Sequence, residues 1–250
     1  MPRPDAAQKI RDAAPSAGAS KRTVAVVVAV LAVAAVVAAI FIGKAVSGGS
    51  TASPAAGGGT SQAVPKGALG FGQGMVVTPN APAGAPVLDI YEDPQCPICK
   101  QFEEIFGPAI DQIVAANEAK VIVHTMTFLD TNLKNDSSKR AANAAMCAAD
   151  QGKFLPYVEA TYAGQPATEG AGYTDAELVG FATKAGVTDM NTWKACLASN
   201  TYLEHVKALE TDSEKAGVNG TPTVKLNGEV VSLNGLDAAS FRAKVKAATK

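Results

Sequence analysis

The sequence predicts an α/β domain with a helical insertion, preceded by one transmembrane helix. Three features lead to this prediction: an uncharged apolar run over residues 24–42, strand-like and helical segments that alternate after residue 85, and an Ala-rich helical stretch over about 133–217 that ends before a hairpin signal. Helices that alternate with strands usually cover the faces of one sheet, which defines the α/β class.

The composition excludes one large class of partner. The 250 residues include 22 basic and 23 acidic side chains, and the formal net charge is −1. Because no basic stripe with interleaved aromatic residues is present, we expect no nucleic-acid partner. The chain has 4 cysteines, an even number that permits complete pairing.

The first apolar run is long enough to cross a membrane. Val24–Ile42 contains no charge and no proline, and as a helix it would span roughly 28 Å, close to the hydrocarbon thickness of a bilayer. Basic residues gather before it, at Arg3, Lys9, Arg11, Lys21 and Arg22. The positive-inside rule therefore predicts a single-pass protein of the cell membrane, with residues 1–23 cytoplasmic and the remainder extracytoplasmic. A cleaved signal peptide is the alternative, although its apolar region is usually only about 7–15 residues long.

Residues 43–74 have the composition of a linker. They are rich in Gly, Ser, Ala and Pro and carry few charges. Such a segment buries too little apolar surface to offset the entropy lost on ordering. We therefore expect a flexible tether here and a folded domain over residues 75–250.

The domain begins with a strand, a helix and a second strand. Pro86–Glu92 has β-branched and aromatic residues and stops at Asp93-Pro94, which predicts a strand followed by a turn. Lys120–Leu129, dense in Val, Ile and Thr, predicts the second strand. Between them, Gly107-Pro108 should kink a helix whose apolar face is formed by Phe102, Ile105, Phe106, Ala109 and Ile113.

Helix boundaries are marked within the Ala-rich stretch. Thr174 with Glu177, and Thr201 with Glu204, have the spacing of a capping box, which predicts two helix starts. Lys184-Ala185-Gly186 and Lys215-Ala216-Gly217 have the form of helix ends, with glycine in the left-handed position.

The chain then returns to the sheet. Thr221–Leu226 and Glu229–Leu233 flank Asn227-Gly228, a strong signal for a β-hairpin. A final helix is expected over Asp237–Ala248, which closes the domain.

Cys96-Pro97-Ile98-Cys99 follows the first predicted strand and its turn and lies at the start of the first predicted helix. Sulfurs three residues apart at a helix start lie on one side and can bridge. Pro97 suits the first helical turn, and the helix dipole should stabilise the thiolate of Cys96. A zinc site would need four ligands, and a purely structural bridge would close too small a loop to constrain the unfolded chain, so a redox-active pair is favoured over both.

Two motifs carry a family resemblance. Tyr91-Glu92-Asp93-Pro94-Gln95-Cys96-Pro97-Ile98-Cys99-Lys100, followed by Phe102, resembles the active-site segment of DsbA-like proteins of the thioredoxin superfamily. Gly220-Thr221-Pro222-Thr223 resembles the loop of that family that bears a cis-proline. The resemblance implies a thioredoxin-like fold with an inserted helical domain over roughly residues 75–250, and the overall layout resembles the membrane-anchored DsbA-like proteins of actinobacteria.

The resemblance also implies roles for individual residues. Cys96 would form the mixed disulfide with a client, Cys99 would be the buried resolving partner, and Thr221 and Pro222 would line the client groove. Ile98 stands where strongly oxidising members often carry histidine.

Many relatives use a buried acid in proton transfer. Asp89 and Glu92 are the candidates here, although an exposed carboxylate at the strand end is the favoured interpretation for each.

The implied function is a thiol-disulfide oxidase that donates a disulfide to reduced exported proteins and needs no cofactor. A membrane reoxidase of the DsbB or vitamin K epoxide reductase type would be its partner, and a monomer is expected. A disulfide reductase or isomerase is the first alternative, and a non-catalytic binding module with the same fold is the second.

Cys147 and Cys196 remain outside the Cys-x-x-Cys pair. In an exported domain two remaining cysteines most often bridge, so we expect a structural disulfide. Two buried free thiols and a second redox site are the alternatives. His124 and His205 show no ligand spacing, and we expect no metal site.

Overall fold

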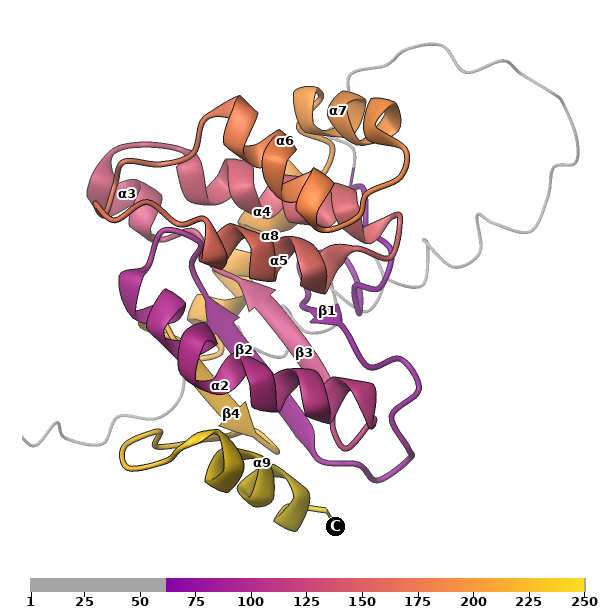
Figure 1. Ribbon diagram of the computed structural model, residues 1–250, viewed down its shortest axis with the longest axis vertical. Coiled ribbons are helices and arrows are strands. Elements are labelled where there is room, and N and C mark those ends of the chain that lie inside the picture. The colour runs from indigo at the N-terminus through magenta and orange to yellow at the C-terminus, as the bar shows by residue number, and fades with distance from the viewer. Residues whose placement is uncertain (1–61, 250) are drawn as a thin grey trace, which may run out of the picture. The chain divides into compact units, whose positions relative to one another are not determined.

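The computed structural model describes residues 62–249 (Figure 1). The predicted anchor, residues 24–42, and the first part of the predicted tether, residues 43–61, lie outside the described residues. Within the range 62–249, no helix has both the length and the apolar character needed to cross a bilayer.

The core of the fold is a five-stranded sheet with the order β1-β3-β2-β4-β5. β2 (Val87–Glu92) lies parallel to β3 (Lys120–Thr125), and the helix between them makes the crossover connection that a parallel pair requires. The other pairs are antiparallel: β1 (Met75–Val76) with β3, β4 (Thr223–Leu226) with β2, and β5 (Glu229–Val230) with β4.

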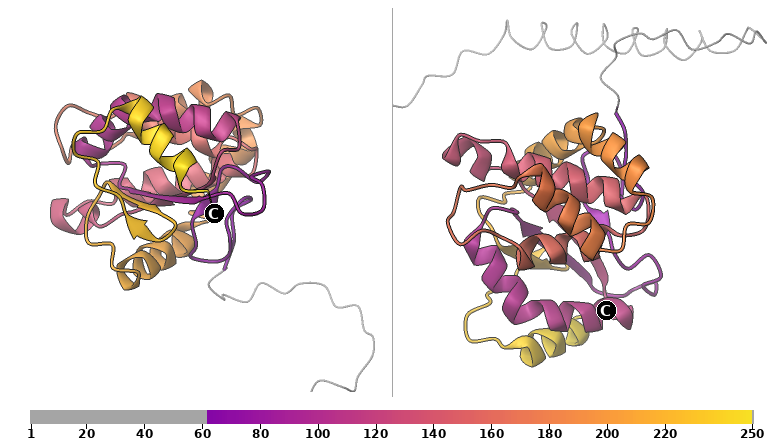
Figure 2. Two further views of the ribbon diagram at one scale, coloured as in Figure 1. Left: turned by 90° about the horizontal axis from the view of Figure 1, so that it is seen from below. Right: turned by 45° about the horizontal axis from the view of Figure 1, so that its top comes forward.

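Two helices lie side by side against the sheet. α2 (Pro97–Ala115) follows β2, and α9 (Ala238–Ala247) ends the fold. Figures 1 and 2 show the two helices next to one another and show that α2 bends midway, near Pro108 inside the helix. Phe106 of α2 packs on Phe241 of α9 with ring centroids 5.1 Å apart, so apolar burial fixes the position of α2, whose first turn carries the two cysteines.

The helical insertion gathers beyond the sheet (Figure 1). Its helices are α3 (Leu129–Leu133), α4 (Ser137–Ala149), α5 (Phe154–Ala163), α6 (Asp175–Lys184), α7 (Met190–Ala198) and α8 (Leu203–Lys215). α4 is the central one, and it is buried along most of its length. Its many alanines allow the neighbouring helices to approach closely, and Trp193 of α7 donates its indole N–H to the carbonyl of Ala144 at 3.1 Å.

Several boundaries agree with the sequence analysis. Thr174 and Glu177 form a reciprocal capping box at the start of α6. Gly186 and Gly217 have positive φ angles of 75° and 79° just after α6 and α8. The hairpin turn at Asn227-Gly228 is present, with positive φ at both residues.

Other boundaries were wrong. The second strand ends at Thr125, because the chain turns into α3 where the sequence predicted a continuing strand. The second capping box does not form, since α8 starts at Leu203 and Thr201 donates instead to the carbonyl of Cys196. The last strand is shorter than predicted and ends at Val230.

Residues 67–76 fold back as a small hairpin that we call the strap. Val76 N donates to Gly67 O at 2.8 Å, and Leu69 N donates to Gly74 O at 3.1 Å. The strap is pinned to α8 by the amide of Gly72, which donates to Nδ1 of the buried His205 at 3.1 Å. The domain therefore includes residues that the sequence analysis assigned to the tether.

The glycines of the strap explain this difference. A Cβ at Gly72, where φ is +72°, would lie 2.7 Å from the Cβ of Ala208, and a Cβ at Gly74 would lie 2.7 Å from the ring of His124. Real side chains do not approach this closely, so these positions need glycine for contact. The same composition is typical of flexible linkers, which is why it was interpreted as a tether.

Candidate redox site

Cys96 and Cys99 lie at the N-terminus of α2. Cys96 is the N-cap residue, with an extended backbone (φ −76°, ψ 117°), and Pro97 occupies the first turn. Both are free thiols; Cys96 is 7% exposed and Cys99 is fully buried. Ile98 between them is 54% exposed. A partner can therefore reach Cys96 more readily than Cys99.

The two sulfurs differ sharply in acidity. The hydrogen bond from the Cys99 thiol, helped by the backbone amides of Cys99 and Ile98, lowers the pKa of Cys96 to about 6 against the opposing effect of burial. For Cys99, burial, the hydrogen bond to Cys96 and the charge of Glu92 all raise the pKa. Because the thiolate is the reactive form, Cys96 is the nucleophile of the pair and Cys99 is held protonated.

The loop before β4 lies against the sulfur of Cys96. The Thr221–Pro222 peptide bond is cis, and the Cys96 sulfur lies 3.6 Å from the carbonyl oxygen of Thr221. The hydroxyl oxygen of Thr221 is a separate atom from this carbonyl; it is buried and has no hydrogen-bond partner among the described residues. It contributes to lowering the pKa of Cys96. The structure thus brings Cys96, Cys99, Thr221 and Pro222 together.

Glu92 is a buried acid, and the expectation of an exposed carboxylate was wrong for it. Its side chain is 2% exposed, and its Oε1 has no hydrogen-bond partner within residues 62–249. Burial, then the neighbouring Glu103, raises its pKa well above the usual range. Alternation along β2 places Glu92 on the same face as the buried Leu88 and Ile90, and this period of two was the signal that could have found it.

Asp89 occupies the other face of β2. Its carboxylate lies 3.0 Å from Nε2 of His124 on β3, and the ring of His124 stacks on Tyr91 with centroids 4.1 Å apart. This cluster fills the far side of the sheet, so Asp89 is separated from the two sulfurs by the strand itself.

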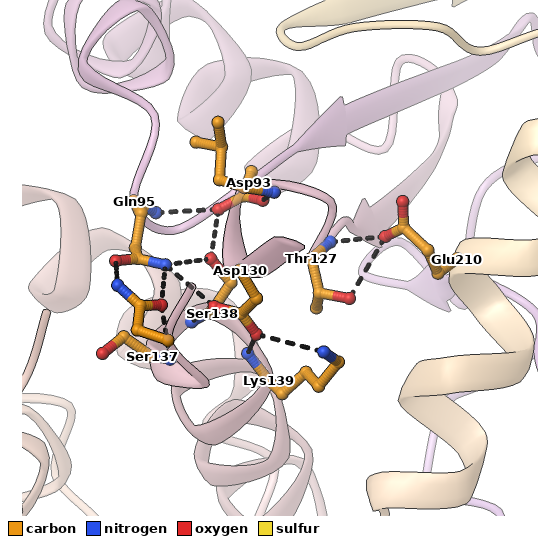
Figure 3. Close-up of polar contacts among 10 residues, drawn as sticks. Asp93, Gln95, Thr127, Asp130, Ser137, Ser138, Lys139 and Glu210 are labelled. Carbon is orange, nitrogen blue, oxygen red and sulfur yellow. Dashed lines mark hydrogen bonds and ion pairs between the residues drawn. The ribbon is translucent and has the colours of Figure 1, made fainter. Parts of the chain in front are cut away.

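The turn before Cys96 is fixed by Asp93, as Figure 3 shows. The carboxylate of Asp93 accepts from Gln95 N at 2.9 Å, from the hydroxyl of Ser138 at 2.5 Å and from Leu129 N at 3.1 Å. Burial raises the pKa of Asp93 to about 7 in spite of these three bonds. Asp93 therefore ties the active-site turn to α3 and α4 of the insertion.

The side chain of Gln95 extends the same network (Figure 3). Its amide nitrogen lies 2.9 Å from Asp130 Oδ1, Asn135 Oδ1 and the hydroxyl of Ser138. Asn135 returns a hydrogen bond to Gln95 Oε1 at 2.9 Å. Sequence analysis singled out neither Asp93 nor Gln95 as a site residue, because their partners lie 35 to 45 residues away.

The second pair of cysteines lies inside the insertion. Cys147 of α4 and Cys196 of α7 are joined by a disulfide, with their Cα atoms 5.9 Å apart and a sequence separation of 49. This bridge links two helices of the insertion and takes no part in the geometry around Cys96.

Comparisons with known proteins agree with this fold. A family model described as Thioredoxin matches residues 79–247. The serine/threonine-protein kinase PknE of Mycobacterium tuberculosis is 33% identical over 149 residues, which are 55% of this chain and 26% of the kinase. The chain thus spans about a quarter of the length of the curated relatives that it matches.

Two solved structures are similar over most of their length. DsbA from Mycobacterium tuberculosis superposes with a TM-score of 0.56 at 30% identity, over 65% of this chain and 82% of that chain. MdbA from Actinomyces oris, described as a thiol-disulfide oxidoreductase, superposes with a TM-score of 0.56 at 26% identity, over 67% of this chain and 83% of that chain.

Proposed function

The chain belongs to the thioredoxin family, in its DsbA-like branch, and on this premise we propose that it is an oxidase that donates the Cys96–Cys99 disulfide to exported proteins. A client thiolate attacks the sulfur of Cys96, and Cys99 leaves as the thiolate. A second client thiolate then attacks the client sulfur of the mixed disulfide and releases the Cys96 thiolate. Two client thiols lose two electrons and two protons. The enzyme pair gains both electrons, Cys99 takes up one proton, and the other proton goes to solvent because Cys96 is released as the thiolate.

One observation carries the choice of an oxidase, namely the lowered pKa of Cys96. A stabilised thiolate is a good leaving group in the second step. It also stabilises the reduced enzyme relative to its disulfide, so the disulfide passes its oxidation readily to another protein. The raised pKa of Cys99 supports attack of the client on Cys96 and not on Cys99. Burial favours the same choice, since a client reaches the less buried sulfur first.

Glu92 supports the first step. When Cys99 leaves, a thiolate develops in a fully buried position, where an unpaired charge is costly. The raised pKa of Glu92 favours its protonated form, and the charge of Glu92 is one of the causes that raise the pKa of Cys99. Glu92 can therefore give a proton to the Cys99 thiolate and take one back when the disulfide is restored.

The client would lie beside the cis-proline loop. Thr221 and Pro222 are half-buried next to Cys96, and Ile98, two residues after Cys96, is an exposed apolar side chain that a client could contact. An extended client segment could place its cysteine at Cys96 and pair its backbone with this loop.

The cellular arrangement is part of the same proposal. The charge bias around residues 24–42 supports a single-pass anchor, with the redox domain on the extracytoplasmic side. A membrane reoxidase of the DsbB or vitamin K epoxide reductase type would restore the disulfide, and the chain would act as a monomer.

The equilibrium reduction potential tests the oxidase directly. It should be measured on the full chain in detergent, since a version cut at residue 75 would remove most of the strap. A potential near that of DsbA, about −120 mV, supports the oxidase. A potential near that of thioredoxin, about −270 mV, contradicts it and favours a reductase or isomerase.

A binding module without redox activity is tested separately. In that case Cys96→Ser would keep the full biological activity of the chain. Loss of that activity in Cys96→Ser, with retention in a variant that lacks only the Cys147–Cys196 bridge, would exclude the binding module.

A further inference from the structure

Two side chains of the insertion hold the backbone that carries Cys96. The side-chain amide of Gln165 donates to the carbonyl of Pro94 at 2.8 Å and to the carbonyl of Cys96 at 3.1 Å. The hydroxyl of Tyr173 donates to the carbonyl of Pro94 at 2.6 Å. Gln165 is 8% exposed and Tyr173 is 3% exposed, so these bonds are shielded from water.

The bonds reach the atoms that fix the direction of the Cys96 side chain. The carbonyl of Cys96 also accepts the first hydrogen bond of α2, from Lys100 N at 3.2 Å, and Cys96 N donates to Asp93 O at 2.9 Å. Both backbone groups of Cys96 are therefore held, and Gln165 adds a second hydrogen bond to its carbonyl. The position of its sulfur relative to the amides of Ile98 and Cys99 is then determined, and the stabilisation by a helix N-terminus falls off within the first turn.

Both side chains come from one connection of the insertion. Gln165 follows Gly164, the C-cap of α5, and Tyr173 immediately precedes Thr174, the N-cap of α6. Arg140 of α4 donates to the carbonyl of Tyr173 at 2.9 Å. The connection is therefore anchored at its far end by the capping box of α6 and by α4, so it can act as a fixed support for the turn over Pro94 and Cys96.

We propose that the helical insertion sets the reactivity of Cys96 through this connection, with Gln165 and Tyr173 as positioning residues. The inference rests on the proposed function, because it concerns the same sulfur. Neither residue touches the reacting atoms. They act by keeping the Cys96 sulfur where the amides of α2 and the Thr221 loop stabilise its thiolate.

The test compares Gln165→Leu, Tyr173→Phe and the double variant with the unchanged full chain in detergent. After mild reduction, the pKa of Cys96 is obtained from the rate of alkylation against pH, with the modified residue located by mass spectrometry. We expect the pKa of Cys96 to rise by about one unit in the double variant, so that alkylation at pH 6 slows about fivefold. Each single variant should show part of this effect.

Matched controls lie in the same insertion. Gln151 accepts from Thr188 N and Asp189 N at 3.1 and 2.9 Å, and the hydroxyl of Tyr202 donates to Asp150 at 2.6 Å. Gln151→Leu and Tyr202→Phe make the same residue changes and remove side-chain hydrogen bonds away from the turn, and should leave the pKa of Cys96 where it is.

An unchanged pKa of Cys96 in the double variant would overturn the proposal and leave Gln165 and Tyr173 with a structural role alone. An equal shift in the control variants would overturn it too. If Gln165→Leu fails to fold, Tyr173→Phe still tests the proposal, because it keeps the ring in place and removes only the hydroxyl. A failure of the oxidase proposal looks different, since it would appear as a strongly reducing potential of the unchanged chain while the pKa of Cys96 still responded to the variants.

Discussion

The two pairs of cysteines in this chain have opposite properties. Cys96 and Cys99 lie three residues apart at a helix N-terminus and are free thiols, whereas Cys147 and Cys196 lie 49 residues apart on two helices and form a disulfide. A bridge over three residues constrains the unfolded chain little, so it can open and close at small cost to stability. A bridge over 49 residues removes much more chain entropy. Sequence separation and local electrostatics therefore assign chemistry to one pair and stability to the other.

The surroundings of the two pairs strengthen this contrast. Around Cys96 the structure places helix amides, the cis-proline loop and the buried Glu92, all of which respond to a charge. Cys147 lies among the alanines of α4, in an apolar part of the core. An apolar environment disfavours a thiolate, so the second pair is protected from exchange as long as the fold is intact.

The largest effect that we predict is the loss of client oxidation when Cys96 is replaced. Cys96→Ser should reduce the oxidation of a reduced client peptide to the uncatalysed rate, because no sulfur remains to form the mixed disulfide. Cys147→Ser with Cys196→Ser should keep most of this activity. Stopped-flow fluorescence of a client peptide measures both. Substantial activity in Cys96→Ser would show that Cys99 or the second pair carries the reaction.

Removal of the structural bridge should have the next largest effect. In the chain-entropy model, a loop of this length contributes about 4 kcal/mol. We expect Cys147→Ala with Cys196→Ala to lower the free energy of unfolding by about that amount, measured by urea denaturation of the oxidised chain. Cys96→Ala with Cys99→Ala is the matched control and should cost much less. Equal losses in the two double variants would remove the distinction between the pairs.

Proton transfer at Glu92 distinguishes the pairs kinetically, because Cys147 and Cys196 are joined in a disulfide and carry no thiol proton to exchange. Glu92→Gln keeps the size of the side chain but removes its exchangeable carboxyl proton. We expect the formation of the mixed disulfide to slow about 100-fold, equivalent to about 2.7 kcal/mol of barrier, as for the loss of a general acid–base group. Rapid-quench trapping with a client peptide measures this step. An unchanged rate at neutral pH would exclude the role proposed for Glu92.

The pH dependence of the free energy of unfolding should also distinguish the two pairs. A lowered thiol pKa contributes stability that is present above the unfolded value, 9.0, and is lost as the pH falls through the folded value, about 6. The thiols of Cys96 and Cys99 titrate only in the reduced chain. Asp93 titrates in both redox forms, so its contribution to stability cancels in the difference between the two forms. The advantage of the reduced over the oxidised chain should grow by about 2.3 kcal/mol from pH 6 to pH 8.

Paired urea denaturations of the two redox forms at each pH check this prediction. A difference between the forms that does not change with pH would mean that Cys96 titrates near its ordinary value. Reduction of the Cys147–Cys196 bridge must be avoided in these measurements, and alkylation followed by mass spectrometry verifies that it is intact.

Features encoded by neighbouring residues were predictable from the sequence. The Cys-Pro-Ile-Cys motif, the hairpin at Asn227-Gly228 and the capping box at Thr174 each depend on a few adjacent positions. The motif at Thr201 has the same form but no capping box, because its hydroxyl finds a backbone acceptor at Cys196 instead. A local signal thus predicts an element only when no tertiary partner competes for the same group.

Features that depend on distant contacts were not predictable. Gln165 and Tyr173 reach Pro94 over 71 and 79 residues, and no local pattern marks them. The strap was missed for another reason, since Gly72 is needed for close contact with α8 and yet has the composition of a linker. Glu92 is an intermediate case, because alternation along its strand indicated burial while its place at the strand end suggested exposure.

The smallest predicted effect concerns the hydroxyl of Thr221. Its oxygen is buried, has no hydrogen-bond partner among the described residues and helps to lower the pKa of Cys96, so the Cys96 thiolate is the acceptor best placed for it. Thr221→Val keeps the branched shape and removes the donor. We expect the pKa of Cys96 to rise by about 0.7, equivalent to about 1 kcal/mol for one hydrogen bond, measured by alkylation against pH.

Thr223→Val is the control for this substitution. Thr223 lies in the same loop, and its hydroxyl donates to the carbonyl of Gly220 at 2.6 Å, not to the sulfur. If the two variants shift the pKa of Cys96 equally, the loop has moved in both, and the effect does not come from the Thr221 hydroxyl. If Thr221→Val alone shifts it, the loop beside the cis-proline stabilises the Cys96 thiolate through a single bond. The Cys147–Cys196 disulfide of the insertion does not titrate, so it has no thiolate that such a hydrogen bond could stabilise.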